Sequence, residues 1–252
     1  MSKANFSACL AATLAEEGGF VDHPKDPGGA TNLGVTIATL GRHLGRPATR
    51  AEVRALTPGA VAPIYRKQFW DAVAGDSLPA GVDLATFDFA VNSGPGRAAK
   101  ALQQAVRVTG EGAGAAALIA ALCDARLSFL RGLTHWRTFG KGWGGRVGRI
   151  KARALLMAGM GAAELRAAAA AMAGAATGDR RKAAAATGGG SGLGALAATS
   201  AAAPERALDG ASLAALGLGA LLLGLCALVL LRRAHARREA AAAMQALAGD
   251  AA

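Results

Sequence analysis

The amino-acid sequence changes character near residue 162, and this change constrains the fold more than any other feature. Before it, apolar residues recur at helical intervals between charged ones, whereas residues 162–210 consist largely of alanine, glycine and serine. Such a composition supplies few of the large apolar side chains that a packed core needs. We therefore expect the core in the first two-thirds of the chain. Residues 161–210 are predicted to form a disordered linker, partly helical at its alanine-rich start.

A run of 21 uncharged residues follows the expected linker. Residues 211–231, "ASLAALGLGALLLGLCALVLL", are enough to cross a hydrocarbon layer of roughly 30 Å. The run predicts one C-terminal transmembrane helix with a basic tail at residues 232–252; a buried core helix is the alternative. Arginines are more frequent after the run than before it, which places the tail in the cytoplasm. We expect a single-pass protein of the bacterial inner membrane, with a periplasmic N-terminal domain favoured over a cytoplasmic one.

The net charge of +11 indicates an anionic partner, which could be nucleic acid, anionic lipid or a wall polymer that carries carboxylates. Aromatic residues make up only 4% of the chain, and no segment alternates basic and aromatic residues, so nucleic acid is disfavoured. The cysteines and histidines are scattered without metal-ligand spacing, and there is no phosphate-binding glycine loop. We expect neither a metal nor a cofactor, and we expect carboxylates to carry the chemistry.

Helical periodicity over residues 3–17 predicts a first helix with Phe6, Leu10 and Leu14 on one apolar stripe. Glu17 falls on this stripe, whereas Glu16 falls at its edge and is expected to point toward water. The β-branched residues at 35–37 then predict a small hairpin or extended turn.

Helix-start signals predict the elements that follow. Thr49 and Glu52 are spaced as a capping box, and Thr57 with Pro58 opens another helix. An apolar helix ends at "SGPG", and three further helices are predicted before residue 160. The first 160 residues are therefore expected to be mainly α-helical, with one small β-hairpin.

The stretch "EEGGFVDHPKDPGGATNLG" contains acids on both sides of a glycine-rich bend. Two carboxylates that flank a sugar can cleave a glycosidic bond, one as proton donor and the other by activating water. The donor needs apolar surroundings to stay protonated, which favours Glu17, whereas Asp26 lies in a polar turn that keeps it ionised. The alternative is a helix end followed by an ordinary turn.

Two resemblances add to this interpretation. The spacing of Glu17, Asp26 and Thr31 resembles the Glu, Asp and Thr arrangement of phage-type lysozymes. The whole stretch, together with "IYRKQFWD" and "FDFAVNSGPGRAAKALQQAV", resembles the glycoside hydrolase family 108 muramidases over residues 5–157. The second resemblance implies a helical, lysozyme-like fold and cleavage between N-acetylmuramic acid and N-acetylglucosamine, with Glu17 as the catalytic acid. It also implies a catalytic domain at residues 1–92 and a helical peptidoglycan-binding-like region at residues 93–160.

Three residues are candidates for substrate binding: Tyr65, Trp70 and Asn92. The aromatic pair has helical spacing that favours core packing, with sugar stacking as the alternative. Asn92, like Asp88 on the same apolar helix, either satisfies buried backbone groups or lines a cleft. The basic segment "RVGRIKAR" at residues 146–153 is predicted to be mostly solvated, with contact to an anionic wall polymer as the alternative.

The sequence thus predicts a peptidoglycan muramidase of the endolysin type. Glu17 would act as general acid, and Asp26 and Thr31 would position water. Its partners would be peptidoglycan, the membrane through the C-terminal helix, and a holin that admits the enzyme to the wall. Two alternatives stay open: a lytic transglycosylase, in which a sugar hydroxyl replaces water, and a non-catalytic wall-binding or holin-like membrane protein.

Overall fold

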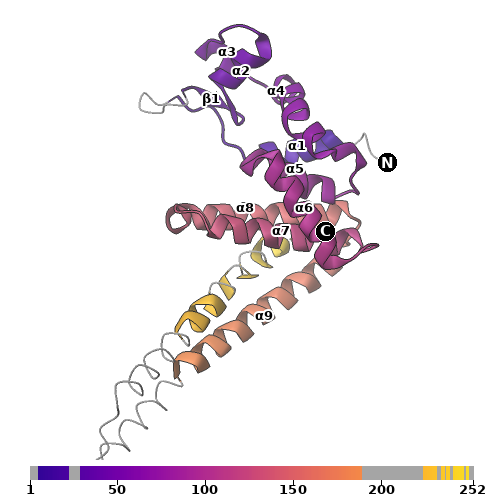
Figure 1. Cartoon of the computed structure of the whole chain (residues 1–252), viewed down its shortest axis with the longest axis vertical. Coiled ribbons are helices and arrows are strands. Elements are labelled where there is room, and N and C mark those ends of the chain that lie inside the picture. Colours follow the sequence, from indigo (N-terminus) through magenta and orange to yellow (C-terminus); the bar gives the residue numbers. More distant parts are fainter. Residues whose placement is uncertain are drawn as a thin grey trace, which may run out of the picture. The chain divides into compact units, whose positions relative to one another are not determined.

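The computed structural model describes residues 5–22 and 29–188, and residues 224–231, 234–235, 237–238, 241–246 and 248–249 of the C-terminal part. Two compact units make up the chain (Figure 1). The first comprises Met1–Leu165 with Leu247–Ala252, and the second comprises Arg166–Ala246.

The described part of the first unit is mainly helical and has one small sheet. In chain order its elements are α1 (Asn5–Leu14), β1 (Thr31–Asn32), β2 (Val35–Thr36), α2 (Ile37–Leu44), α3 (Arg50–Arg54), α4 (Pro58–Tyr65), α5 (Val82–Ser93), α6 (Pro95–Thr109), α7 (Ala115–Arg131) and α8 (Trp136–Met157). A π-helical turn, Arg66–Trp70, and two 3-10 turns, Asp71–Val73 and Gly75–Ser77, join α4 to α5. These elements confirm the predicted mainly α-helical class with a small hairpin.

Helix α5 forms the centre of this unit and packs against α1, α6, α7 and α8 (Figure 1). Every residue from Val82 to Ala90 is buried, because neighbouring elements surround this largely apolar helix on all sides. Near the middle of α5, Phe87 forms an edge-to-face aromatic cluster with Phe6 of α1 and Trp70, with ring centroids 5.3–6.0 Å apart.

The local start and stop signals are confirmed. The Thr49 hydroxyl accepts from the Glu52 N–H, and the Glu52 carboxylate accepts from the Thr49 N–H at 2.7 Å, which completes the capping box. Thr57 caps α4 by accepting from the N–H of Ala60. Helix α5 ends at Gly94, whose φ of 90° suits glycine.

The predicted hairpin is also confirmed. Strands β1 and β2 pair antiparallel, with Thr31 opposite Thr36, and the turn between them contains Leu33 and Gly34 at positive φ. The Asn32 amide anchors the hairpin to α3 by donating to the carbonyls of Val53 and Arg54, each at 3.1 Å.

Two predicted boundaries in the first unit differ from the structure. Helix α1 ends at Leu14, so Glu16 and Glu17 lie in the turn that follows it. The expected division between residues 92 and 93 falls before the last residue of α5, and α5 and α6 pack together inside one compact unit. The apolar sequence of α5 explains this, because its buried surface needs helices from both sides of the expected division.

The alanine-rich segment expected to be a disordered linker begins with a long helix, α9 (Ala162–Gly188). Within the second unit, Ala169, Ala176 and Ala183 are buried at seven-residue intervals, as are Ala227, Ala234 and Ala241. The Arg237 guanidinium donates to the Asp179 carboxylate at 2.7 Å. The expected helical start of this segment is confirmed, and the helix extends over residues 162–188, because alanine favours helix and a heptad repeat gives a helix one continuous contact seam. Residues 189–210 lie outside the described part.

Most of the expected transmembrane run, residues 211–223, also lies outside the described residues, whereas residues 224–231 are helical. Among the helices that the structure does describe, none combines the length and the apolar character needed to cross a bilayer.

Candidate active site

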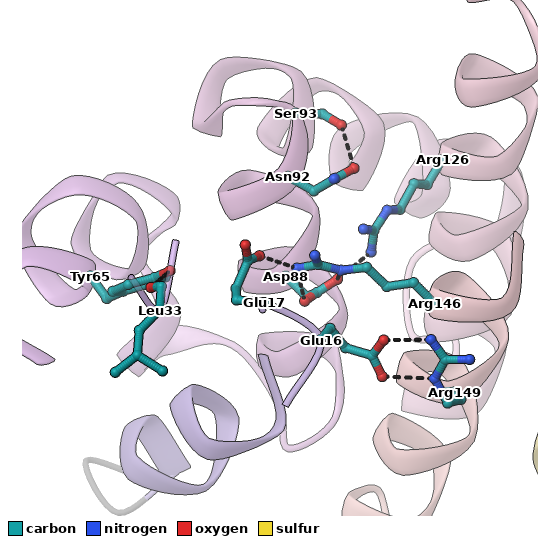
Figure 2. Close-up of polar contacts among 10 residues, drawn as sticks. All are labelled: Glu16, Glu17, Leu33, Tyr65, Asp88, Asn92, Ser93, Arg126, Arg146 and Arg149. Carbon is teal, nitrogen blue, oxygen red and sulfur yellow. Dashed lines mark hydrogen bonds and ion pairs between the residues drawn. The ribbon is translucent and has the colours of Figure 1, made fainter. Parts of the chain in front are cut away.

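Glu16 and Glu17 extend from the turn after α1 toward α8 (Figure 2). Their N–H groups donate to the carbonyls of Thr13 and Leu14, which holds the turn against the end of the helix. The Glu17 carboxylate accepts from Nη2 of Arg146 at 2.7 Å. The Glu16 carboxylate accepts two bonds from Arg149, at 2.9 and 2.6 Å.

The surroundings of the two glutamates differ from the prediction. The Glu16 side chain is 7% exposed and the Glu17 side chain is 20% exposed, so Glu16 does not point toward water. Glu17 has a guanidinium as its nearest charged partner instead of a purely apolar setting. The prediction was wrong about the burial of Glu16 and about the charged partner of Glu17 because it extended the first helix to residue 17. The chain instead turns after Leu14, which directs both acids at α8.

Glu17 is the outer member of a cluster of alternating charges (Figure 2). In order, the ion-paired side chains are Arg126, Asp88, Arg146 and Glu17. Asp88, which is completely buried, accepts from Arg126 Nη1 at 2.6 Å, from Arg146 Nη2 at 2.8 Å and from Arg146 Nε at 3.2 Å. The side chains of Arg126 and Arg146 are 2% and 11% exposed. The cluster thus joins α5, α7 and α8 and fixes the guanidinium that holds Glu17.

Burial and charge act in opposite directions within this cluster. Burial alone would raise the pKa of Asp88, but the guanidiniums of Arg126 and Arg146 outweigh it and hold that pKa below its ordinary value. Burial would likewise lower the pKa of Arg146, but Asp88 and then Glu17 raise it above its ordinary value. Asp88 is therefore held as an anion and Arg146 as a cation, and the positive group that contacts Glu17 is the Arg146 guanidinium.

The β-hairpin closes the other side of Glu17. The Tyr65 hydroxyl donates to the carbonyl of Leu33 at 2.8 Å, and burial, then the nearby Glu17 carboxylate, raises the pKa of Tyr65. A Cβ atom at Gly34 would lie 2.4 Å from the Tyr65 hydroxyl oxygen and 3.0 Å from Oε2 of Glu17. Glycine at this position, with φ of 72°, therefore leaves the space in which Glu17 and Tyr65 meet the hairpin.

The other predicted site residues have different surroundings. Asp26 lies outside the described residues. Thr31 is on β1, where its backbone pairs with Val21 and its hydroxyl donates to the Gly29 carbonyl at 3.3 Å. No hydrogen bond of the described residues joins the Thr31 side chain to Glu17.

The three candidates for substrate binding differ in their exposure to solvent. Trp70 is completely buried, and its indole N–H donates to Asp76 at 3.0 Å, so this ring packs the core and is closed to a sugar. Tyr65 is buried but places its hydroxyl beside Glu17. Asn92 is exposed and lines a pocket at the end of α5.

Arg146 is the residue whose role the sequence did not indicate. The segment 146–153 was expected to be mostly solvated, yet Arg146 is nearly buried, and Lys151 is buried with its amine 3.3 Å from the Asp124 carboxylate. One signal was available: Arg146 and Arg149 are one helical turn apart, which suits two adjacent acids. Among the residues that the structure describes, no group of histidine, cysteine and acidic side chains is arranged to hold a metal ion.

This mainly helical unit presents a partly exposed glutamate between a hairpin and a fixed arginine, and such a carboxyl group is compatible with one of the two that a glycoside hydrolase uses. Comparison with known proteins agrees with this class. The family model described as glycosyl hydrolase 108 matches residues 10–94. The solved structure of SagA from Brucella abortus is 48% identical, with a TM-score of 0.55; the match covers 62% of this chain and 97% of that one. The chain therefore belongs to the glycosyl hydrolase 108 family. A search of curated proteins gives no match.

Proposed function

We propose that this protein hydrolyses peptidoglycan at the bond between N-acetylmuramic acid and N-acetylglucosamine, with Glu17 as general acid. The observation that carries the proposal is the setting of Glu17. Its carboxylate is partly exposed, fixed by Arg146 on one side and close to Gly34 and Tyr65 on the other, in a chain of a glycoside hydrolase family.

In the proposed reaction, protonated Glu17 donates its proton to the glycosidic oxygen as the bond from that oxygen to the anomeric carbon breaks. Negative charge then develops on the Glu17 carboxylate, 2.7 Å from Nη2 of Arg146 in the free protein. A fixed guanidinium stabilises that charge without reorganising, because Asp88 already holds it from behind. Arg146 is thus a positioning residue, and Asp88 acts through it.

Water completes the proposed reaction by bonding to the anomeric carbon and losing a proton to a base. Asp26 is our candidate for this base, with Thr31 helping to orient the water. Direct attack by water predicts an inverted product and a separation of roughly 6.5–9.5 Å between the two carboxyl groups. A covalent adduct on Asp26 would contradict this part of the proposal.

The neighbouring glutamates provide a matched test. Both accept from an arginine of α8, so Glu17→Gln and Glu16→Gln each remove one negative charge from a similar ion pair. We expect Glu17→Gln to lower the rate at least roughly 100-fold, as for loss of a positioned general acid, and Glu16→Gln to retain most of it. The rate is the loss of turbidity of purified peptidoglycan, and circular dichroism checks the folding of both variants.

Mass analysis of the released fragments separates the enzymatic alternatives. Hydrolysis yields reducing muramic acid ends, whereas a lytic transglycosylase yields anhydro ends. Equal losses in both variants, or anhydro products, would overturn the proposal. An absence of any fragment with the wild-type chain would favour a non-catalytic wall-binding protein.

A further inference from the structure

A separate pocket of about 260 Å³ lies where the end of α5 and the start of α6 meet α7 and α8. Its lining combines polar residues with aromatic rings: Asn92, Ser93, Arg97, Phe129 and Trp143 contribute together with two leucines. Pockets for drug-sized ligands usually have roughly 300–1,000 Å³, so this one fits a short appendage better than a whole disaccharide.

The Arg97 guanidinium is held in place at this pocket. It lies over the Phe129 ring, 4.1 Å from the centroid, and Nη1 donates to the Ser93 carbonyl at 2.9 Å. No carboxylate of the described residues pairs with it. A planar guanidinium with free donors is the group best suited to bind a carboxylate by two parallel hydrogen bonds.

The pocket lies one helical turn from the residues that hold Glu17. Asn92 follows Asp88 by four residues on α5, and Trp143 precedes Arg146 by three residues on α8. Side chains three or four apart on a helix are neighbours, with Cβ atoms roughly 5–6 Å apart. Helix α5 thus places Asn92 in the pocket and Asp88 in the charge cluster, one turn away. Helix α8 does the same with Trp143 and Arg146. We infer that a ligand bound at Glu17 can extend into the pocket.

We propose that this pocket is a subsite for the acidic peptide arm of the wall polymer, with Arg97 binding a carboxylate of that arm. This inference rests on the proposed function, because muramic acid next to the cleaved bond carries such an arm on its lactyl ether. The Asn92 amide and the indole of Trp143 provide further donors for the carbonyls of the arm. The subsite would favour strands that still carry their peptides over bare glycan.

The test compares kcat/KM for glycan strands with their peptides and for the same strands after an amidase has removed them. We expect the wild-type chain to favour the peptide-bearing strands and Arg97→Gln to reduce that preference about tenfold or more, the effect of losing hydrogen bonds to a charged group. Arg107→Gln is the matched control, because it removes the same charge from the exposed surface of the same helix, away from the pocket. The control is expected to keep the wild-type preference.

A second variant and a binding measurement keep the result decisive. Asn92→Asp places a negative charge in the pocket at an exposed position and should also weaken the preference. Calorimetric titration of the Glu17→Gln chain with a soluble disaccharide-peptide, and with the same disaccharide without peptide, measures the subsite without turnover. Equal behaviour of Arg97→Gln and Arg107→Gln, or no preference in the wild-type chain, would overturn the subsite. Absence of hydrolysis of both strands would instead overturn the proposed function, and the titration would then decide on the subsite alone.

Discussion

The replacement Asp88→Asn tests whether the buried charge cluster holds the first unit together. Asp88 is completely buried and accepts three hydrogen bonds from two guanidiniums. Asparagine has nearly the same shape but no charge, and its amide NH₂ group would face donors instead of accepting from them. The variant would leave two nearly buried positive charges with no negative group between them.

The structure sets the expected size of this effect. Removing one partner of a buried ion pair costs about 3–5 kcal/mol in the free energy of unfolding, because the remaining charge stays buried. For a unit of this size each kcal/mol lowers Tm by about 2–4 °C, so the expected drop is about 6–20 °C. Arg46→Gln is the control: it breaks an ion pair whose arginine and glutamate side chains are 55% and 34% exposed, so it should lower the free energy of unfolding far less than Asp88→Asn does.

The assay is urea denaturation of the full chain followed by tryptophan fluorescence. All three tryptophans, Trp70, Trp136 and Trp143, belong to the first unit, so the signal reports that unit alone. If Asp88→Asn changes the free energy of unfolding no more than Arg46→Gln does, the cluster is not the structural element that we infer.

Three further predictions follow from the same contacts. Gly34→Ala should lower both activity and stability, because a Cβ at this positive φ would collide with the Tyr65 hydroxyl and approach Glu17. Gly59→Ala is the control and should lower neither, since no neighbouring atom lies nearer than 3.9 Å to its Cβ position. Similar activities for the two variants would contradict this prediction. Because the pKa of Asp88 is lowered by folding, its contribution to stability should be fully present above about pH 4 and be lost as the pH falls through the lowered value. The difference in unfolding free energy between wild type and Asp88→Asn should therefore shrink in acid, and a constant difference from pH 7 to pH 3 would refute it. A fragment of residues 1–165 should be soluble and folded by near-ultraviolet circular dichroism, since the first unit ends its main segment at Leu165; loss of that signal would assign part of its fold to the rest of the chain.

The features predicted correctly from sequence are those that local chemistry decides. The capping box of Thr49 and Glu52 depends on residues three positions apart, and the stop at Gly94 depends on glycine at positive φ followed by proline. The hairpin at residues 31–36 likewise agrees with the β-branched residues at 35–37, which predicted a small hairpin or an extended turn. Such signals need no knowledge of what the rest of the chain does.

The features that the sequence did not reveal depend on distant pairs. Arg146 is 129 residues from Glu17 and 58 residues from Asp88, and no periodicity relates residues that far apart. A basic segment on a helix is usually solvated, so the expectation for residues 146–153 followed the common case. In the same way, the sequence alone does not distinguish alanines at seven-residue intervals from a low-complexity linker. Their role becomes clear only from the burial of such alanines both in α9 and in residues 227–241.

The position of Glu17 therefore depends on parts of the chain that were expected to serve a different purpose. The region at residues 93–160 was expected to bind the wall, yet α7 and α8 supply the two arginines that surround Asp88. A carboxylate in a turn after a short helix would otherwise adopt many orientations, since a free turn restricts side-chain rotation little. Fixing Arg146 inside the core transfers the rigidity of α5, α7 and α8 to Glu17. Because the same helices line the pocket at Arg97, a substrate that contacts both would be aligned by one rigid body.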